Sequence, residues 1–336
     1  MAKHAVSFGV MLAVASATAN AQQRVEVPAT YEAGHFYATP TLANGHVLRL
    51  LVDTGGGGSG GWFVMFKAGV TRAALTSRPC TVDDESLEVV TTLDYREGQG
   101  LPTRSATPCH APAVITSEEP ADSMDGLLGS GYLPGQIWTF DYPAQKLWRE
   151  ASDWRSSADM HRATLGMLRN SKGTPQSGFA RISVQVDGKP LDLLLDTGAT
   201  AHPTEAGKIA GTEVTASGFG VTSYITTSQL ERWHGQHPAW RVVNDGDDLG
   251  SRGPGKGARL IEVPHLVVAG WDVGPVWFTE RPDANFTARP GNWLNMMDGP
   301  VAGALGANVY RHFRMTIDYP HGAAYLACSA GCRPTS

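Results

Sequence analysis

The sequence VLRLLVDTG at residues 47–55 decides the interpretation of this chain, because its form occurs twice. At residues 191–198 the chain reads LDLLLDTG, which is again a Leu-rich apolar run followed by Asp-Thr-Gly. An apolar run bounded by glycine predicts a buried strand. A carboxylate at the end of such a strand is unfavourable unless hydrogen bonds or a partner charge stabilise it. Two such carboxylates, Asp53 and Asp196, are what an acid/base pair built from two duplicated halves requires.

The length and composition indicate two β-rich domains. A chain of 336 residues suits two domains of about 150 residues each. With 42% apolar and only 18% charged residues, it can bury two cores. Its 39 Gly and 21 Pro, separated by short Val, Leu and Thr segments, favour short strands joined by tight turns. We therefore predict a mostly β protein.

The charge pattern argues against two classes of partner. The formal net charge of −5 comes from 27 basic and 32 acidic residues, and no basic run occurs. Nucleic-acid binding needs a concentrated Lys/Arg surface, and binding to an anionic membrane needs a polybasic segment. After the first 21 residues no run of 18 apolar residues occurs either, so we expect no membrane span in the mature chain.

Residues 1–21 have the pattern of a secretory signal peptide. Lys3 gives a positive start, residues 6–15 form a short apolar stretch, and Ala19-Asn20-Ala21 is a small-residue cleavage site. The alternative is a buried N-terminal strand or helix, which leaves the cleavage site unexplained. We expect export to the periplasm or the exterior, with a mature chain that starts near Gln22.

The four cysteines suit an oxidising compartment. Three disulfide pairings are open, and we favour Cys80 with Cys109 and Cys328 with Cys332, because each pair stays within one half. A metal site is the competing interpretation. No His-x-x-x-His or Cys-x-x-Cys spacing supports it, so we expect no metal and no cofactor.

A second pair of segments also repeats. The first half has DGLLG at 125–129 and WTFDYP at 138–143, and the second half has AGALG at 302–306 and MTIDYP at 315–320. Gly129 lies 12 residues before Asp141, and Gly306 lies 12 residues before Asp318. We interpret each set as a Gly-flanked apolar turn, a short helix or loop, and a hairpin. Asp141 and Asp318, which precede Tyr-Pro, are predicted turn formers.

Local patterns place the remaining elements. Strands are predicted at 46–52, with a turn at Asn44-Gly45 before it, and at 62–66, 87–93 and 258–263. A short helix is predicted at 228–234, ended by Pro238, and a glycine-rich loop at 245–257. The polar segment 151–178 is interpreted as a connection between the halves. This gives an N-terminal lobe at 22–174 and a C-terminal lobe at 175–336.

Two other site types fit the sequence less well. Gly55, Gly57 and Gly60 match G-x-G-x-x-G, but a dinucleotide-binding unit needs a helix after the loop, and 62–66 predicts a strand. A serine hydrolase needs a Gly-x-Ser-x-Gly elbow, which does not occur. The histidines also lack triad spacing: His110, His202, His234 and His237.

Two apolar-Asp-Thr-Gly strands, each followed by an apolar-apolar-Gly turn, resemble the pepsin-like aspartic proteases and their retropepsin-like relatives over most of the mature chain. The resemblance implies a β-rich bilobal fold in which the two loops meet at the base of a cleft. It implies that Asp53 and Asp196 are the catalytic pair. It also implies supporting residues in the two loops, with threonine hydroxyls as braces and glycines that allow close approach: Thr54, Gly55, Thr197 and Gly198.

The chemistry implied is peptide hydrolysis without a metal or a covalent intermediate. Two carboxylates that share a site hold a single proton over a range of pH, because both cannot easily ionise. One can deprotonate a water while the other polarises a carbonyl oxygen. We therefore expect an exported, monomeric aspartic endopeptidase that acts on polypeptides. The rival is a non-catalytic protein that binds peptides or proteins in the same cleft. The presence of both aspartates and both threonines argues against that rival, and the glycines at 56–61, which would loosen the first loop, argue for it.

Three positions depart from the pepsin-like pattern. Gly56 and Ala199 stand where pepsin-like enzymes place Ser or Thr, and Asp-Thr-Gly-Ala is the retropepsin form. Losing a hydroxyl donor to an ionised oxygen raises the pKa of a carboxyl, so we predict an activity optimum less acidic than that of digestive pepsins. Tyr95 is the candidate flap residue, although its segment lacks Tyr-Gly-x-Gly; the alternative is an aromatic in a solvated turn.

Overall fold

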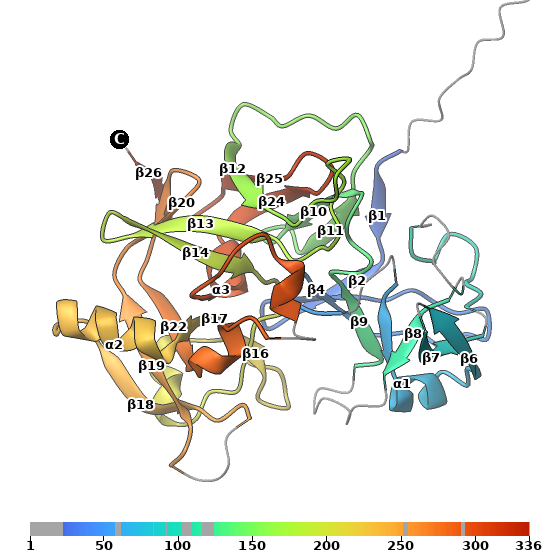
Figure 1. Cartoon of the computed structure of the whole chain (residues 1–336), viewed down its shortest axis with the longest axis horizontal. Helices are drawn as coiled ribbons and strands as arrows, with labels where there is room; N and C mark the ends of the chain where they lie inside the picture. The colour runs from blue at the N-terminus through green and yellow to red at the C-terminus, as the bar shows by residue number, and fades with distance from the viewer. Residues whose placement is uncertain are drawn as a thin grey trace, which may run out of the picture.

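The computed structural model describes residues 23–57, 62–82, 84–91, 93–102, 109, 111–115, 124–250, 255–289 and 293–335. The predicted signal peptide at 1–21 and most of the glycine run at 56–61 lie outside these ranges. Strands account for 43% of the chain and helices for 12%, which confirms the mostly β prediction. The halves lie on opposite sides of the molecule and meet in a shared sheet (Figure 1).

The first half forms an eight-stranded sheet. Across it the strands run in the order β2 (Ala29–Glu32), β3 (His35–Ala38), β4 (Leu50–Asp53), β9 (Gly126–Gly129), β5 (Val64–Phe66), β8 (Ala113–Ile115), β7 (Glu85–Val90) and β6 (Ser77–Val82). The strand predicted at 46–52 is observed as β4, which begins only at Leu50. Before it, Val47 makes an isolated bridge to Thr41 across the Asn44-Gly45 turn.

A sixteen-stranded sheet carries the second half and joins it to the first. Its main path runs in the order β1 (Val25–Val27), β11 (Lys146–Arg149), β10 (Ile137–Asp141), β24 (Phe313–Asp318), β25 (Ala323–Cys328), β12 (His161–Gly166), β13 (Arg181–Val186), β14 (Lys189–Leu195), β23 (Gly303–Leu305), β17 (Ser223–Thr226), β22 (Val276–Arg281), β19 (Ala258–Val263) and β18 (Val242–Asp247). Three further strands branch from β13: β20 (Leu266–Val268), β21 (Trp271–Val273) and β26 (Cys332–Pro334).

The two glycine-flanked segments predicted as turns are strands. β9 pairs in parallel with β4, with Asp53 opposite Gly129. β23 pairs in parallel with β14, with Leu195 opposite Leu305. Glycines allow β9 and β23 to pack closely against their other neighbours, because a side chain at Gly126 or Gly303 would collide with a backbone carbonyl of the antiparallel strand β5 or β17. Each repeat therefore supports the strand that carries its aspartate.

The segment at 151–178 is more than a connection. It contains β12, which pairs with β25 and then with β13. Beside it, β10 of the first half pairs with β24 of the second half, and Thr139 is opposite Thr316 with their hydroxyls 2.7 Å apart. The polar composition misled the prediction because β12 alternates buried and exposed residues.

Few helices complete the described structure. They are α1 (Lys67–Arg72), α2 (Thr227–Gln236), α3 (Ala307–Tyr310) and the 3₁₀ turns η2 (Ala206–Ala210), η3 (Asp283–Phe286) and η4 (Trp293–Met296). β15 (Thr200–Ala201) and β16 (Gly220–Val221) form a separate two-stranded sheet. α2 confirms the predicted helix, and β19 confirms the predicted strand. β18 extends into the predicted glycine-rich loop.

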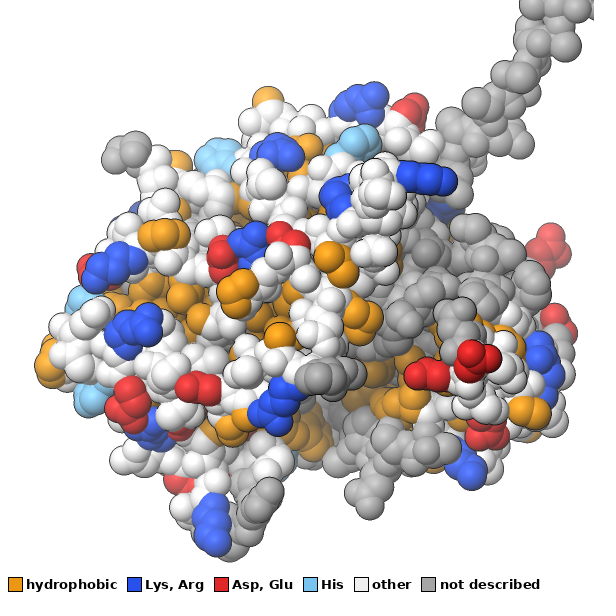
Figure 2. Space-filling view, in the orientation of Figure 1, with side chains coloured by type: hydrophobic (Ala, Val, Ile, Leu, Met, Phe, Trp, Pro, Cys, Tyr) orange, Lys and Arg blue, Asp and Glu red, His pale blue; other side chains and the backbone are white. Residues whose placement is uncertain are grey.

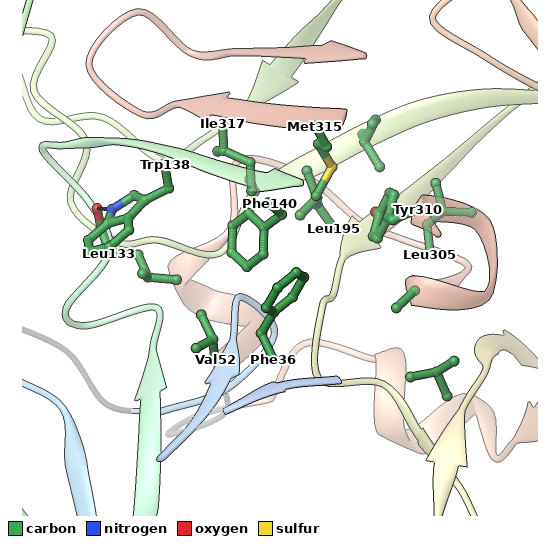
Figure 3. Packing of buried hydrophobic residues seen from close by; sticks show 14 of the residues in the cluster. Phe36, Val52, Leu133, Trp138, Phe140, Leu195, Leu305, Tyr310, Met315 and Ile317 are labelled. Atoms are coloured by element: carbon green, nitrogen blue, oxygen red, sulfur yellow. Dashed lines mark hydrogen bonds between the residues drawn. The ribbon is translucent and has the colours of Figure 1, made fainter. Parts of the chain in front are cut away.

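The core extends beneath both aspartate-bearing strands. Val52 of β4 and Leu195 of β14 belong to one buried cluster with residues of the shared sheet (Figure 3). Phe36 packs edge-on against Phe140, with ring centroids 5.8 Å apart. Because one continuous core supports both strands, the ends of β4 and β14 are fixed relative to each other.

Two disulfides and two aspartate-containing turns further stabilise the fold. The structure contains the disulfides Cys80–Cys109 and Cys328–Cys332, as predicted. Asp141 accepts a hydrogen bond from the backbone amide of Ala144 at 3.1 Å, and Asp318 accepts one from His321 at 3.1 Å. Both aspartates are therefore turn formers. Within the described residues, no helix is long and apolar enough to cross a bilayer.

Candidate active site

The two repeats bring Asp53 and Asp196 together. Asp53 is the last residue of β4, and Asp196 directly follows β14. The backbone amide of Asp196 donates to Leu305 of β23 at 3.0 Å, which holds the second loop on its supporting strand. Asp196 is 8% exposed and Asp53 is half-buried. The parallel strand pairs thus deliver two carboxyl groups to one point between the halves.

Reciprocal threonine hydrogen bonds join the two loops. The Thr54 hydroxyl donates to the Leu195 carbonyl at 2.7 Å and accepts from the Thr197 amide at 2.9 Å. The Thr197 hydroxyl donates to the Val52 carbonyl at 2.7 Å and accepts from the Thr54 amide at 3.1 Å. Both side chains are buried, so each bond is protected from water. The loops are therefore cross-braced symmetrically.

Two glycines allow the loops to approach each other. A Cβ atom at Gly55 would lie 2.5 Å from Oδ1 of Asp196, and one at Gly198 would lie 2.5 Å from Oδ1 of Asp53. Real Cβ atoms do not come this close to a neighbouring atom. Each loop therefore places a bare backbone against the carboxyl group of the other loop.

Backbone amides orient both carboxyl groups. The Gly55 amide donates to Oδ1 of Asp53 at 2.8 Å, and the Gly198 amide donates to Oδ1 of Asp196 at 3.0 Å. The following amides, of Gly56 and Ala199, also donate to these carboxyl groups. Such bonds favour the ionised form of a carboxyl group.

Burial nevertheless raises the pKa of both carboxyl groups. For Asp53 desolvation outweighs the bonds from Gly55 and Gly56, and the pKa is above the ordinary aspartate range. For Asp196 desolvation acts together with the charge of Asp53 and a hydrogen bond to it, so the pKa lies well above that range. The pair therefore titrates in two steps and holds one proton between them, and the two steps belong to the pair as a whole.

Buried tyrosines form an aromatic floor that contributes to this desolvation. Tyr142, Tyr310 and Tyr319 are at most 3% exposed. Burial raises the pKa of each hydroxyl, and the nearby carboxylates add to this: Asp196 for Tyr142 and Tyr310, and Asp53 for Tyr319. Tyr142 and Tyr319 follow Asp141 and Asp318 in the two repeats. The floor of the site therefore shares the duplication of its loops.

The second loop has supports that the sequence did not reveal. The Tyr224 hydroxyl donates to the Thr200 carbonyl at 2.6 Å and accepts from the Thr200 amide at 2.8 Å. Burial raises the pKa of Tyr224 to about 12, so it stays protonated at neutral pH. The Arg281 guanidinium lies 4.4 Å from the Tyr224 ring centre and pairs with buried Asp247 at 3.3 Å. No motif links these residues to Asp196, because strand pairing alone brings them together.

A hollow of about 390 Å³ opens beside Asp196. It is lined by Gly55 of the first half and, from the second half, by Leu194, Asp196, Tyr224, Arg281, Ala284, Asn285, Phe286 and Trp293. The surface is hollowed between the two halves on the face drawn in Figure 2, where cationic and anionic side chains are intermixed. The hollow can therefore hold a side chain of a ligand that reaches the carboxyl pair.

The structure places Tyr95 beside the first lobe's core. Tyr95 bridges to Leu42, and the Arg96 and Thr41 backbones are hydrogen-bonded at 2.9 Å. Burial raises the pKa of the Tyr95 hydroxyl, with a further contribution from Tyr132. These contacts show a packed aromatic side chain and not a solvated one. Its role as a flap residue stays a prediction.

The donor set of the site does not favour a metal ion. Within the part of the chain that the structure describes, no group of three or more His, Cys, Asp or Glu side chains converges on one point. The two carboxyl groups instead accept hydrogen bonds from backbone amides. This arrangement can hold one proton between a carboxyl oxygen of Asp53 and one of Asp196, next to a bound substrate.

Crystal structures of two proteins are among the solved structures that resemble the chain. The crystal structure of an aspartic proteinase from Irpex lacteus shares 12% identity with a TM-score of 0.45, covering 92% of this chain and 98% of the other. The crystal structure of basic 7S globulin from soybean shares 11% identity with a TM-score of 0.41, covering 92% and 95%. No family model matches the sequence, and no curated protein matches it.

Proposed function

We propose that this protein is an aspartic endopeptidase with Asp53 and Asp196 as its catalytic pair. The observation that carries the proposal is the reciprocal loop structure: each carboxyl group lies against the glycine backbone of the other loop, and two threonines lock the loops together. A structural turn aspartate needs its own amide bonds only. It does not need a second aspartate in contact with it.

The proposed mechanism starts from a carboxyl pair that holds one proton, drawn on Asp196. Ionised Asp53 takes a proton from a water bound between the carboxyl groups, and the oxygen of that water attacks the peptide carbonyl carbon. Protonated Asp196 gives its proton to the carbonyl oxygen, which gives a neutral tetrahedral intermediate. When the C–N bond breaks, the proton on Asp53 passes to the leaving nitrogen and a hydroxyl proton returns to Asp196. The pair then has its starting protonation.

The surroundings of the pair support a polypeptide substrate. Leu194, Phe286 and Trp293 give the hollow beside Asp196 an apolar wall. An apolar or aromatic side chain next to the cleaved bond would bury its surface there. We further propose that the chain acts as a monomer after export, because both carboxyl groups come from one chain and two disulfides suit an oxidising compartment.

The test is hydrolysis of an unfolded polypeptide by the chain from residue 22 onward, across pH. Asp53→Asn and Asp196→Asn should each lower kcat by at least about 10³-fold, because each removes one proton-transfer group. Asp141→Asn is the matched control, because it removes a repeated aspartate that only forms a turn. It should cleave at the wild-type rate.

The same variants separate an enzyme from a non-catalytic binding protein on this fold. A binding protein would show no cleavage at any pH, while the affinity for the polypeptide would change little in Asp53→Asn. Product formation that persists in both active-site variants would assign the activity to other residues and defeat the proposal.

A further inference from the structure

A second cavity lies between the halves, next to the turn at 142–145 and separate from the hollow beside Asp196. Its volume is about 310 Å³, and it shares no lining residue with the hollow beside Asp196. The first half contributes Tyr31, Gly34 and the turn at 142–145, and the second half contributes residues from η2, β18 and β22 and from the end of α3. Small-molecule sites have volumes of roughly 300–1,000 Å³. The cavity is therefore large enough for a small ligand.

Most polar groups in the cavity wall are already satisfied within the protein. The Thr222 and Thr279 hydroxyls are 2.8 Å apart, and the Asn308 amide group donates to the Trp277 carbonyl at 2.9 Å. Buried Asp247 accepts from the His202 amide at 2.8 Å and pairs with Arg281. These residues shape the wall, and they leave no net charge on it.

Two opposite charges in the wall are not satisfied in this way. Among the described residues, Glu213 and Arg311 have no ion pair and no side-chain hydrogen bond; both line the cavity, and both are exposed to solvent. Tyr31 lies near both: burial raises the pKa of its hydroxyl, the Glu213 charge raises that pKa further, and the Arg311 charge lowers it. The Tyr31 hydroxyl also has no hydrogen-bond partner in the described structure. One cavity therefore presents a cation, an anion and a free hydroxyl.

We propose that this cavity binds a small zwitterion, namely a free α-amino acid or a dipeptide. Its carboxylate would pair with Arg311, its ammonium group with Glu213, and its side chain would contact the rings of Tyr31 and Trp277. Arg is suited to a carboxylate because its planar guanidinium donates two parallel hydrogen bonds. The volume is at the lower end of the range for ligand sites, which favours this size over a longer peptide.

Such a ligand would connect the two halves. Gly34 of the first half packs against Val221 of the second half at the cavity edge, and a Cβ there would lie 2.7 Å from Cγ1 of Val221. A ligand that contacts Tyr31 on one side and Arg311 on the other would add to this junction. Because a ligand that binds only the folded state stabilises it, occupancy should raise the melting temperature.

Calorimetric titration tests the proposal with defined probes. L-phenylalanine and glycyl-L-phenylalanine carry both charges, N-acetyl-L-phenylalanine only the carboxylate, and L-phenylalaninamide only the ammonium group. We expect at least one zwitterion to bind, and the capped probes to bind about tenfold or more weakly, since each loses a hydrogen bond to a charged group. Tighter binding of L-phenylalanine would identify the ligand as a free amino acid, and tighter binding of glycyl-L-phenylalanine would identify it as a dipeptide. The Asp196→Asn variant should bind equally, so the result does not depend on the proposed proteolysis.

Two variants and two controls assign the binding to the cavity. Arg311→Gln should lose the preference for phenylalanine over phenylalaninamide, and Glu213→Gln should lose the preference over N-acetyl-phenylalanine. Arg333→Gln and Glu97→Gln remove exposed charges elsewhere and should bind like the wild type. The proposal is overturned if neither zwitterion binds at about 10 mM, if the capped probes bind equally well, or if both cavity variants bind like the wild type.

Discussion

The two aspartate loops make the same hydrogen bonds but are supported differently. In the first loop the support is backbone: the Ser130 amide donates to the Gly56 carbonyl at 2.7 Å. Gly57 has a φ of +84°, and a Cβ there would lie 3.0 Å from the Cα of Gly129, so only glycine fits. In the second loop the equivalent backbone bond runs from the Thr222 amide to the Ala199 carbonyl at 3.1 Å, and a side chain adds to it: Tyr224 is bonded to both backbone groups of Thr200.

The added side chain does not make the two carboxyl groups chemically different in kind. Desolvation is the largest cause that raises the pKa of each, and each accepts a hydrogen bond from the glycine amide of its own loop. Duplication therefore supplies the geometry of the pair, and the retained proton belongs to the pair as a whole.

The largest effect is expected when a side chain is placed between the two loops. Gly55→Ala and Gly198→Ala each place a Cβ on the opposite carboxyl group, which must then move. A displacement on the order of 1 Å can cost about 10²-fold in rate, so we expect at least that loss in kcat. The measurement is steady-state peptide hydrolysis at the optimal pH.

Gly235→Ala is the matched control for these two substitutions. Gly235 lies in α2 with no atom near the position of its missing Cβ, so alanine fits there. Activity should be unchanged, and the helix should gain up to about 1 kcal/mol. Wild-type activity in Gly55→Ala or Gly198→Ala would show that the loops are not in close contact in solution.

The next largest effect concerns the threonine braces, in which the two loops are equivalent. Thr54→Val and Thr197→Val each leave one buried carbonyl and one buried amide without a partner. We expect each to lower the free energy of unfolding by about 2–4 kcal/mol. Urea denaturation measures this, with Thr174→Val, at an exposed position, as the neutral control. A loss confined to one threonine would show that the bracing is not reciprocal.

A smaller effect distinguishes the positions that follow the two Asp-Thr-Gly motifs. Ala199 already has a Cβ, so Ala199→Ser adds only a hydroxyl near Asp196. That donor should stabilise the ionised form and move the pH profile down by about one unit. Gly56→Ser instead places its Cβ against the Asp53 carboxyl group, so it should lower kcat. Equal behaviour of the two serine variants would contradict the difference between the loops.

The smallest effect is expected in how the stability of the protein changes with pH. Since the folded-state pKa of Asp196 lies well above its unfolded value, the carboxyl favours folding at low pH, and this contribution is lost as the pH rises through the raised pKa. Asparagine cannot ionise, so Asp196→Asn should lose less stability than the wild type between about pH 4 and pH 8. Thermal unfolding across that range gives the comparison. Parallel curves would place the pKa of Asp196 in the ordinary range.

The sequence predicted the parts of this structure that are encoded locally and repeated. The two Asp-Thr-Gly motifs, the mostly β fold, both disulfides, α2 and β19 could be read from short patterns. The parallel pairing of β4 with β9 could not, because a four-residue glycine-flanked run fits a turn equally well. β12 was hidden because its alternating polar residues resemble a linker.

The surroundings of the site were beyond sequence reasoning for a different reason. Tyr224 and Arg281 reach Asp196 through the pairing of β17 with β22, and their distance along the chain gives no sign of it. The enclosure of the two carboxyl groups is likewise a property of packing. Sequence therefore named the candidate catalytic pair, and the structure was needed to show how the two carboxyl groups are enclosed and braced.

The most direct test of the central claim, that two carboxyl groups share one proton, is the pH dependence of kcat/KM for a single peptide substrate. A bell-shaped profile is predicted: activity rises as the pair loses its first proton and falls as it loses the second. Because both pKa values are raised, the maximum should lie above the pH of ordinary aspartate titration. A profile with no acid limb, or activity that keeps increasing beyond neutral pH, would contradict the shared-proton account.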